Sequence, residues 1–139
     1  MKDKAILFGW IAGLLLLISM LWIFTQPLQT LYLLRTINNV FISNNDSRRL
    51  SSYLHQRTPK AGLLGYWFLM NNPEKRMFVF TVFQNGILIP LGAVVSANGT
   101  VEEILPLSAH AVQAFEDLPK SILQMHVSRI EDGAAGGGR

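Results

Sequence analysis

Cysteine is absent from all 139 residues of the chain. Its absence excludes disulfides, thiolate zinc sites, iron–sulfur ligation and cysteine nucleophiles. Charge is also scarce, since Asp, Glu, Lys and Arg together make up 15% of the residues, against about 25% in an average soluble domain. A deficit of this size is typical of a chain with a membrane-spanning segment, and the hydrophobic share of 50% agrees with it.

Motifs that carry chemistry are lacking too. The chain contains no P-loop, dinucleotide fingerprint or G-x-S-x-G sequence. His55, His110 and His126 are isolated and have no metal-site spacing; we expect His110 in the first turn of a helix and His126 on the outward face of a strand, both solvated. Glu102 and Glu103 are adjacent, so a strand would point them to opposite faces and prevent a catalytic pair. We therefore predict no catalytic, cofactor-binding or metal-binding residue, and a protein that is not an enzyme.

The few charges are unevenly distributed. Through residue 60 there are seven Lys or Arg and two Asp or Glu, whereas beyond it there are five and seven. The basic excess therefore lies in the N-terminal part, where anionic lipid headgroups would attract it. A basic face over the whole chain, as in nucleic-acid-binding proteins, is not present, and no nucleic-acid partner is predicted.

What the sequence does have is one long apolar run, Ala5 to Phe24, with twenty uncharged positions and no proline. As a helix it would be roughly 30 Å long, the thickness of the hydrocarbon core of a bilayer. Bulky residues at its exit leave no small-residue cleavage site, which favours an uncleaved anchor over a signal peptide. We predict a short cytoplasmic tail over 1–4 and a transmembrane helix over 5–25, with the lipid bilayer as a partner.

Flanking charges predict the orientation of this helix. Lys2 and Lys4 precede it, and only Arg35 lies within about 20 residues after it, so the N-terminus is expected in the cytoplasm. The domain beyond the helix would then be periplasmic or extracellular. Arg48 and Arg49 lie just outside this window and leave the inverted orientation open.

A juxtamembrane helical region is predicted over 26–60. Apolar residues recur at three- and four-residue steps from Leu28 to Ile42, which indicates an amphipathic helix after a possible kink at Pro27. A second, short helix is predicted over 48–56. The apolar stripe of the first helix has two interpretations: it covers the core of its own domain, or it packs on a partner protein or a second copy of the chain.

The segment 61–131 is predicted to be a small α+β domain. Four apolar runs, 63–70, 76–84, 87–97 and 100–107, indicate an antiparallel meander whose second strand is central. Asn85-Gly86 and Asn98-Gly99 are hairpin signals, and Pro90 with Gly92 indicates an edge or a bulge.

After the meander, we expect a helix capped by Ser108, ended by Pro119, and a fifth strand over 123–128. Helices would cover one face of the sheet. The Gly-rich tail over 132–139 has no core-forming residues and is expected to be disordered.

Aromatic side chains concentrate on the first two predicted strands. The simpler interpretation is a packed core, because aromatics supply much of the buried area of a small domain. The alternative is an open sheet face that binds a ligand or partner. The residues concerned are Tyr66, Trp67, Phe68, Phe78, Phe80 and Phe83.

No motif identifies a family, but the order of elements allows a comparison of layout. An anchor, a helical stalk and a small α+β domain resemble the bitopic assembly proteins of type II secretion and type IV pilus systems. The meander with flanking helices is also similar to PAS-like extracytoplasmic sensory domains. The first resemblance implies an accessory, scaffold or assembly subunit that binds protein through the juxtamembrane helix. The second implies a tethered ligand-binding or sensory domain that uses the aromatic sheet face.

Overall fold

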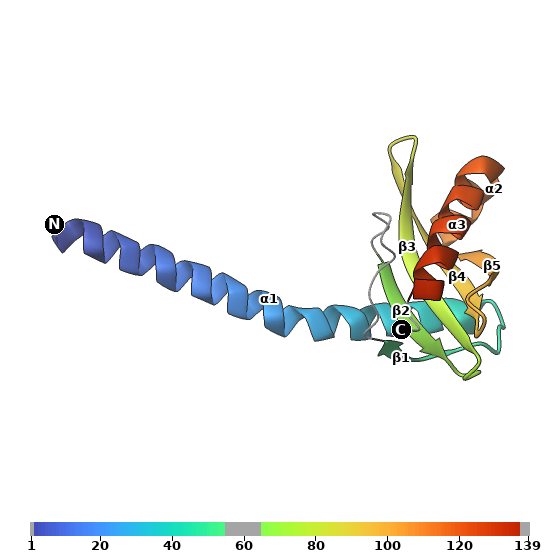
Figure 1. The fold of residues 1–139 in the computed structure, drawn as a ribbon, viewed down its shortest axis with the longest axis horizontal. Coiled ribbons are helices and arrows are strands. Elements are labelled where there is room, and N and C mark those ends of the chain that lie inside the picture. Colours follow the sequence, from blue (N-terminus) through green and yellow to red (C-terminus); the bar gives the residue numbers. More distant parts are fainter. Residues whose placement is uncertain (1, 55–64, 137–139) are drawn as a thin grey trace. The chain divides into compact units, whose positions relative to one another are not determined.

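The structure is a computed structural model that describes residues 2–54 and 65–136. The chain divides into two compact units, one ending at Leu33 and the other beginning at Leu34. The described residues form one long helix, α1 (Lys2–Ser43), then five strands, and then helices α2 (Ala109–Glu116) and α3 (Lys120–Gly136) (Figure 1). The α+β class with a long N-terminal helix is confirmed.

The N-terminal unit is helix without a core. Every residue from Lys2 to Phe24 is exposed, and the apolar run predicted as the anchor is long and apolar enough to cross a membrane. Pro27 lies inside α1, and the helix continues on both sides of it. The Thr25 hydroxyl donates to the Trp22 carbonyl at 3.0 Å and the Thr30 hydroxyl to the Pro27 carbonyl at 2.9 Å. These hydroxyls add hydrogen bonds around the turn in which proline lacks its backbone N–H.

The second unit is built on an antiparallel sheet in the order β1-β2-β3-β4-β5. The described strands run in a meander, with β3 in the middle, as the sequence predicts for this apolar segment (Figure 1). Their bounds are β1 Leu50–Leu54, β2 Gly65–Met70, β3 Lys75–Gln84, β4 Ile87–Ser96 and β5 Val101–Pro106.

Two turns connect the long strands, and both use backbone with positive φ. Asn85 and Gly86 have φ of 52° and 77°, which confirms the type I′ hairpin between β3 and β4. The turn between β4 and β5 is not the second type I′ turn that the dipeptide Asn98-Gly99 suggests. The Gly99 N–H donates to the Ser96 carbonyl at 3.0 Å, and Gly99 alone has positive φ in this turn, 83°. This pattern is a type I turn followed by a left-handed glycine, the common three-residue hairpin loop.

Gly92 is paired on both sides, so the prediction of an edge or a bulge is wrong there, whereas Pro90 stands just beyond the last residue pair between β4 and β5. Pro90 pairs with Thr81, and its carbonyl still accepts the N–H of Leu107 at 3.0 Å. Proline is tolerated at position 90 because the residue pairs between β4 and β5 end at Leu91. The backbone N–H that Pro90 lacks is therefore not needed for a further pair with β5. At Gly92 a Cβ would lie 3.0 Å from the Met77 sulfur, so close packing explains this glycine. The irregularity in β4 lies at Val94/Val95 instead.

The short helix predicted over 48–56 is wrong, because β1 occupies Leu50–Leu54; His55 and Gln56 lie outside the described residues. Backbone pairing outweighed the helical spacing of a few apolar residues: Leu50 faces Met70 of β2. The Asn38 side chain of α1 also holds this strand, accepting from the Leu50 N–H at 2.7 Å and donating to its carbonyl at 3.0 Å.

The strand predicted over 123–128 is also wrong, since these residues belong to α3. Its inward residues recur at helical steps, Leu123, His126, Ile130 and Ala134, whereas Met125 is 44% exposed. The helix continues to Gly136, so 132–136 is helical rather than disordered, and 137–139 lie outside the described residues.

Helix α2 begins as the sequence predicts. The Ser108 hydroxyl oxygen accepts the N–H of Ala111 at 3.1 Å and caps the first turn. The helix ends at Glu116, with Asp117 as its C-cap, two residues before Pro119. Pro119 then accepts hydrogen bonds from the N–H groups of Ile122 and Leu123 and so begins α3.

Both faces of the sheet are covered, which corrects the expectation of helices on one face. On one face, a core joins alternate strand residues to α2 and α3, and its members include Trp67, Phe78, Phe80, Ala111 and Ile130. The strand positions between them point to the other face.

On this second face Phe68, Met77 and Val79 are buried as well. The two buried residues of α1, Ile37 and Phe41, lie in the part of the helix that crosses this face (Figure 1). The last turns of α1 therefore belong to the folded domain.

Candidate functional site

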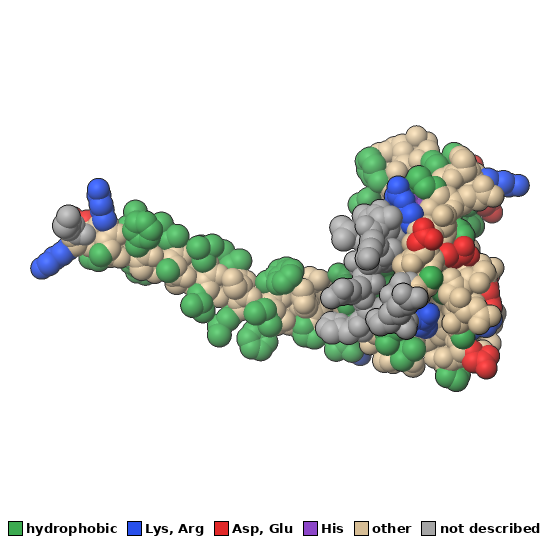
Figure 2. Space-filling model, viewed as in Figure 1, with side chains coloured by type: hydrophobic (Ala, Val, Ile, Leu, Met, Phe, Trp, Pro, Cys, Tyr) green, Lys and Arg blue, Asp and Glu red, His purple; other side chains and the backbone are tan. Residues whose placement is uncertain are grey.

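Among the described residues, the first part of α1 carries the most exposed apolar surface (Figure 2). A shallow groove runs along it, and Gly9 and Gly13 lie in that groove, four residues apart. A Cβ at either glycine would meet nothing within 4 Å, so the helix backbone is open there. The groove is lined by Ile6, Gly9, Trp10, Gly13, Leu14 and Leu17.

Small residues at this spacing allow two membrane helices to approach closely, because no side chain separates their backbones. The signal is the G-x-x-x-G pattern inside an apolar run. This pattern, Gly9-x-x-x-Gly13, is present in the sequence and is the local signal that could have indicated the groove.

The juxtamembrane part of α1 divides its apolar residues between two surroundings. Ile37 and Phe41 are buried in the second unit, which agrees with the interpretation that the stripe covers the domain's own core. Leu28 and Leu31 remain exposed, by 64% and 63%. The exposed large apolar residues of this part of α1 therefore lie before Leu33, apart from Ile42, which is 55% exposed.

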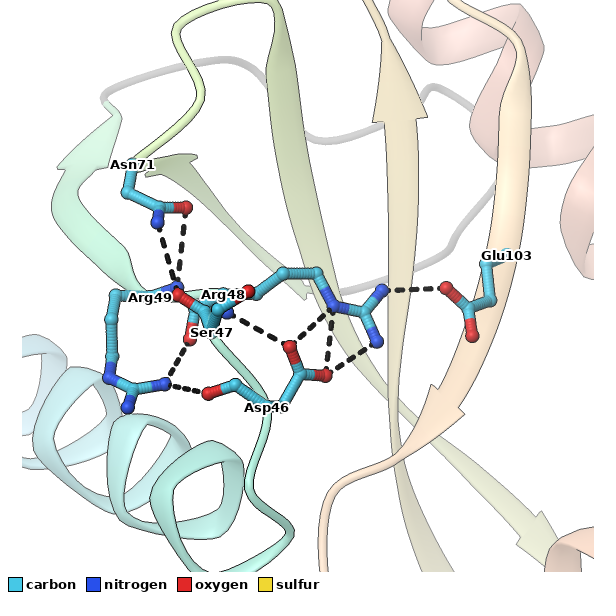
Figure 3. A network of polar contacts seen from close by, with 6 residues as sticks. All are labelled: Asp46, Ser47, Arg48, Arg49, Asn71 and Glu103. Carbon is cyan, nitrogen blue, oxygen red and sulfur yellow. Dashed lines mark hydrogen bonds and ion pairs between the residues drawn. The ribbon is translucent and has the colours of Figure 1, made fainter.

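A network of polar contacts follows α1 and centres on Arg48 (Figure 3). Its guanidinium holds both carboxylate oxygens of Asp46, at 2.7 to 3.1 Å, and reaches Glu103 of β5 at 2.6 Å. It also lies 5.7 Å from the ring centre of Phe41. One arginine thus joins the last turn of α1, the connecting segment and the edge strand of the sheet.

Neighbouring residues extend the network toward β2. The backbone N–H of Arg49 donates to the Asn71 side-chain oxygen at 3.3 Å, and the Asn71 amide donates to the Ser47 carbonyl at 3.2 Å (Figure 3). The Arg49 guanidinium donates to the carbonyls of Asp46 and Arg48. These bonds order the segment between α1 and β1.

Charge in this network is balanced, which indicates a structural role. Hydrogen bonds from Arg48 lower the pKa of Asp46 below its usual range, and the Asp46 carboxylate raises the pKa of Arg48. A lowered carboxyl pKa suits a permanent ion pair rather than a proton-transfer group. Glu102 forms a separate pair with Lys75 at 2.6 Å, so Glu102 and Glu103 serve different partners.

The two histidines that the structure describes, His110 and His126, lie in different environments. His110 is exposed in the first turn of α2, as the sequence predicts, and His55 lies outside the described residues. Among the described residues, no three His, Asp or Glu side chains are placed to hold a metal ion.

His126 corrects its prediction, because it is only 9% exposed and packs 5.6 Å from the ring centre of Phe80. Its Nδ1 is buried and has no hydrogen-bond partner in the part of the chain described. Burial, and then the charge of Arg129, lower the pKa of His126. The prediction missed this burial because it gave residues 123–128 the two-residue period of a strand, whereas they follow the 3.6-residue period of helix α3.

Most of the aromatic concentration lies in the core. Trp67, Phe78 and Phe80 are 1%, 0% and 2% exposed, and their rings pack in a row at 4.9 and 5.8 Å. The simpler interpretation is thereby confirmed for these residues. Phe83 is the clear exception, at the far end of β3 with 68% of its surface exposed.

Comparison with known proteins finds no relative of this chain. No family model matches the chain, and no curated protein or solved structure matches it.

Proposed function

We propose that the chain is a single-pass membrane protein that works by binding, as an accessory, scaffold or assembly subunit of a larger membrane complex. The observation that carries this proposal is the contrast between the two units. Residues 2–24 form an apolar helix with every residue exposed, while the second unit has a packed core on both sheet faces. In aqueous solution the apolar surface of such a helix would stay exposed to water, whereas a lipid bilayer would cover it.

The partner in this proposal is another membrane helix, either of a different subunit or of a second copy. The groove with Gly9 and Gly13 supports it, because close helix approach is the common mode of association inside lipid. The exposed Leu28 and Leu31 extend the available surface to the juxtamembrane turns.

Lys2 and Lys4 before the span support an N-terminus in the cytoplasm and a domain on the periplasmic or extracellular side. A non-catalytic role fits the polar network around Arg48, where each charged group is engaged in holding the fold.

A tethered sensory or ligand-binding domain of PAS-like type is the second candidate. It depends on an open aromatic face of the sheet. The burial of Trp67, Phe78 and Phe80 takes that face away from a ligand, so we prefer the protein-binding role.

Extraction and co-purification test the proposal. The full chain should stay with membranes through an alkaline wash and, in mild detergent, should run with a partner or as an oligomer. Gly13→Leu should keep the membrane association and reduce the complex, because the side chain fills the groove. Ala12→Leu adds the same side chain outside the groove and is the control. A lone monomer with no stable partner would contradict the proposal.

A further inference from the structure

The hairpin that joins β3 to β4 ends in an unusual apolar tip. Phe83 and Leu88 are 68% and 67% exposed and face each other across the two strands, and Ile87 is 57% exposed beside them. The residues 77–95, which include the whole tip, contain no charged or titratable side chain. Exposed strand ends are normally protected by charge, so a tip of this composition indicates a surface that is covered in use.

The tip also projects beyond the rest of the described sheet. Pairing of β2 with β3 ends at Phe80, and pairing of β4 with β5 ends at Leu91. Four residues of each strand continue to the Asn85-Gly86 turn, a projection of about 13 Å at the usual strand rise. The two-residue type I′ turn holds this ribbon in register, so the apolar side chains are presented on a defined backbone.

We propose that this tip inserts into the interfacial layer of the same bilayer that holds α1. The inference rests on the membrane anchor of the proposed function. Only nine residues lie between Phe24, the end of the apolar run, and Leu34, the start of the folded unit, which is about 15 Å of helix from one to the other. A connection this short limits how far the domain, and the tip with it, can move away from a bilayer that holds the apolar run.

The chemistry of the tip suits the interface between water and lipid. Phe83, Ile87 and Leu88 supply apolar side chains, and the absence of charge from 77–95 avoids the cost of burying an ion. The polar Asn85 and the peptide groups of the turn confine it to the headgroup layer, where water still satisfies peptide groups. A protein groove that accepts the same residues is the competing occupant, and the experiment separates the two.

Because the chain has no cysteine, single-cysteine labelling tests the proposal on the full protein. Phe83→Cys and Leu88→Cys would each carry a polarity-sensitive fluorophore, in nanodiscs of phosphatidylcholine with and without brominated lipid. Val112→Cys on α2, an exposed apolar position with 47% of its surface open, is the matched control. Trp10 and Trp22 in α1 report the anchor independently, since brominated lipid quenches tryptophan that lies in the bilayer.

We expect brominated lipid to quench the labels at 83 and 88 at least about threefold more than the label at 112, as for side chains held in the interface. Equal quenching at all three positions, with Trp10 and Trp22 quenched, would overturn the hairpin proposal and leave the anchor. Tryptophans that lipid does not quench would overturn both. A blue-shifted label that neither lipid nor iodide quenches would mean that protein covers the tip, and it would also overturn the proposal.

Discussion

Replacing Phe41 tests whether the last turns of α1 are part of the domain core. Phe41 is 4% exposed, so truncation to Ala removes a nearly buried ring; such a change costs about 3–5 kcal/mol in protein cores. Loss of the contact with the Arg48 guanidinium adds roughly 0.5–1 kcal/mol. The expected loss is a large fraction of the stability of a small domain, which is about 5–15 kcal/mol in total.

Urea unfolding of the detergent-solubilised full chain would measure this loss. Trp10→Phe and Trp22→Phe leave the buried Trp67 as the reporter of the second unit. With an m value of about 1.5 kcal/mol per molar urea, Phe41→Ala should lower the midpoint by roughly 2–4 M. Ile42→Ala is the matched control: it is the next residue and is 55% exposed, so its effect should stay within about 0.5 kcal/mol. Equal effects of the two substitutions would refute the packing of α1 on the sheet.

Two further substitutions test the opposite face of the sheet. Burial lowers the pKa of His126 in the folded state below its ordinary value of 6.5, so the unfolded chain takes up this proton first. The contribution to stability is fully present above pH 6.5 and falls as the pH drops toward the lowered pKa. The urea midpoint should therefore fall between pH 8 and pH 5, and His126→Gln should remove part of this fall. His110→Gln, at an exposed site, is the control and should leave the fall unchanged. A pH profile that stays the same in His126→Gln would contradict the prediction. Gly65→Ala should destabilise by more than about 2 kcal/mol, because the added Cβ would collide with the Val79 carbonyl oxygen, whereas a Cβ at Gly9 meets no atom within 4 Å. Equal urea midpoints for Gly65→Ala and Gly9→Ala would show that β2 can shift at no cost.

Local signals accounted for much of the fold before any tertiary contact was known. The run from Ala5 to Phe24 needs only its length and composition to be a candidate span. Asn85-Gly86 predicts its own turn because few residues accept two positive φ angles in succession. Ser108 predicts a helix start, since its hydroxyl satisfies a backbone donor three residues later.

The errors fall where local patterns are ambiguous. A few apolar residues around Leu50 fit a short helix or a strand, and pairing with β2 decided the outcome. From Leu123 to Ser128 apolar and polar residues alternate as in a strand, although Leu123 also stands at helical spacing to Ile130 and Ala134. A short window fits both the two-residue period of a strand and the 3.6-residue period of a helix. His126 was misplaced with its segment, and its burial followed from the helix rather than from its own neighbours.

The long apolar N-terminal helix and the antiparallel hairpins were determined by the sequence alone, because each depends on residues adjacent or nearly adjacent along the chain. Only the tertiary structure decided which apolar residues are covered. It buried Ile37 and Phe41 of one helix, left Leu28 and Leu31 open, and exposed Phe83 while enclosing Phe80. Burial depends on which distant segments meet, as when Arg48 reaches Glu103 across 55 positions, and no local pattern contains that information.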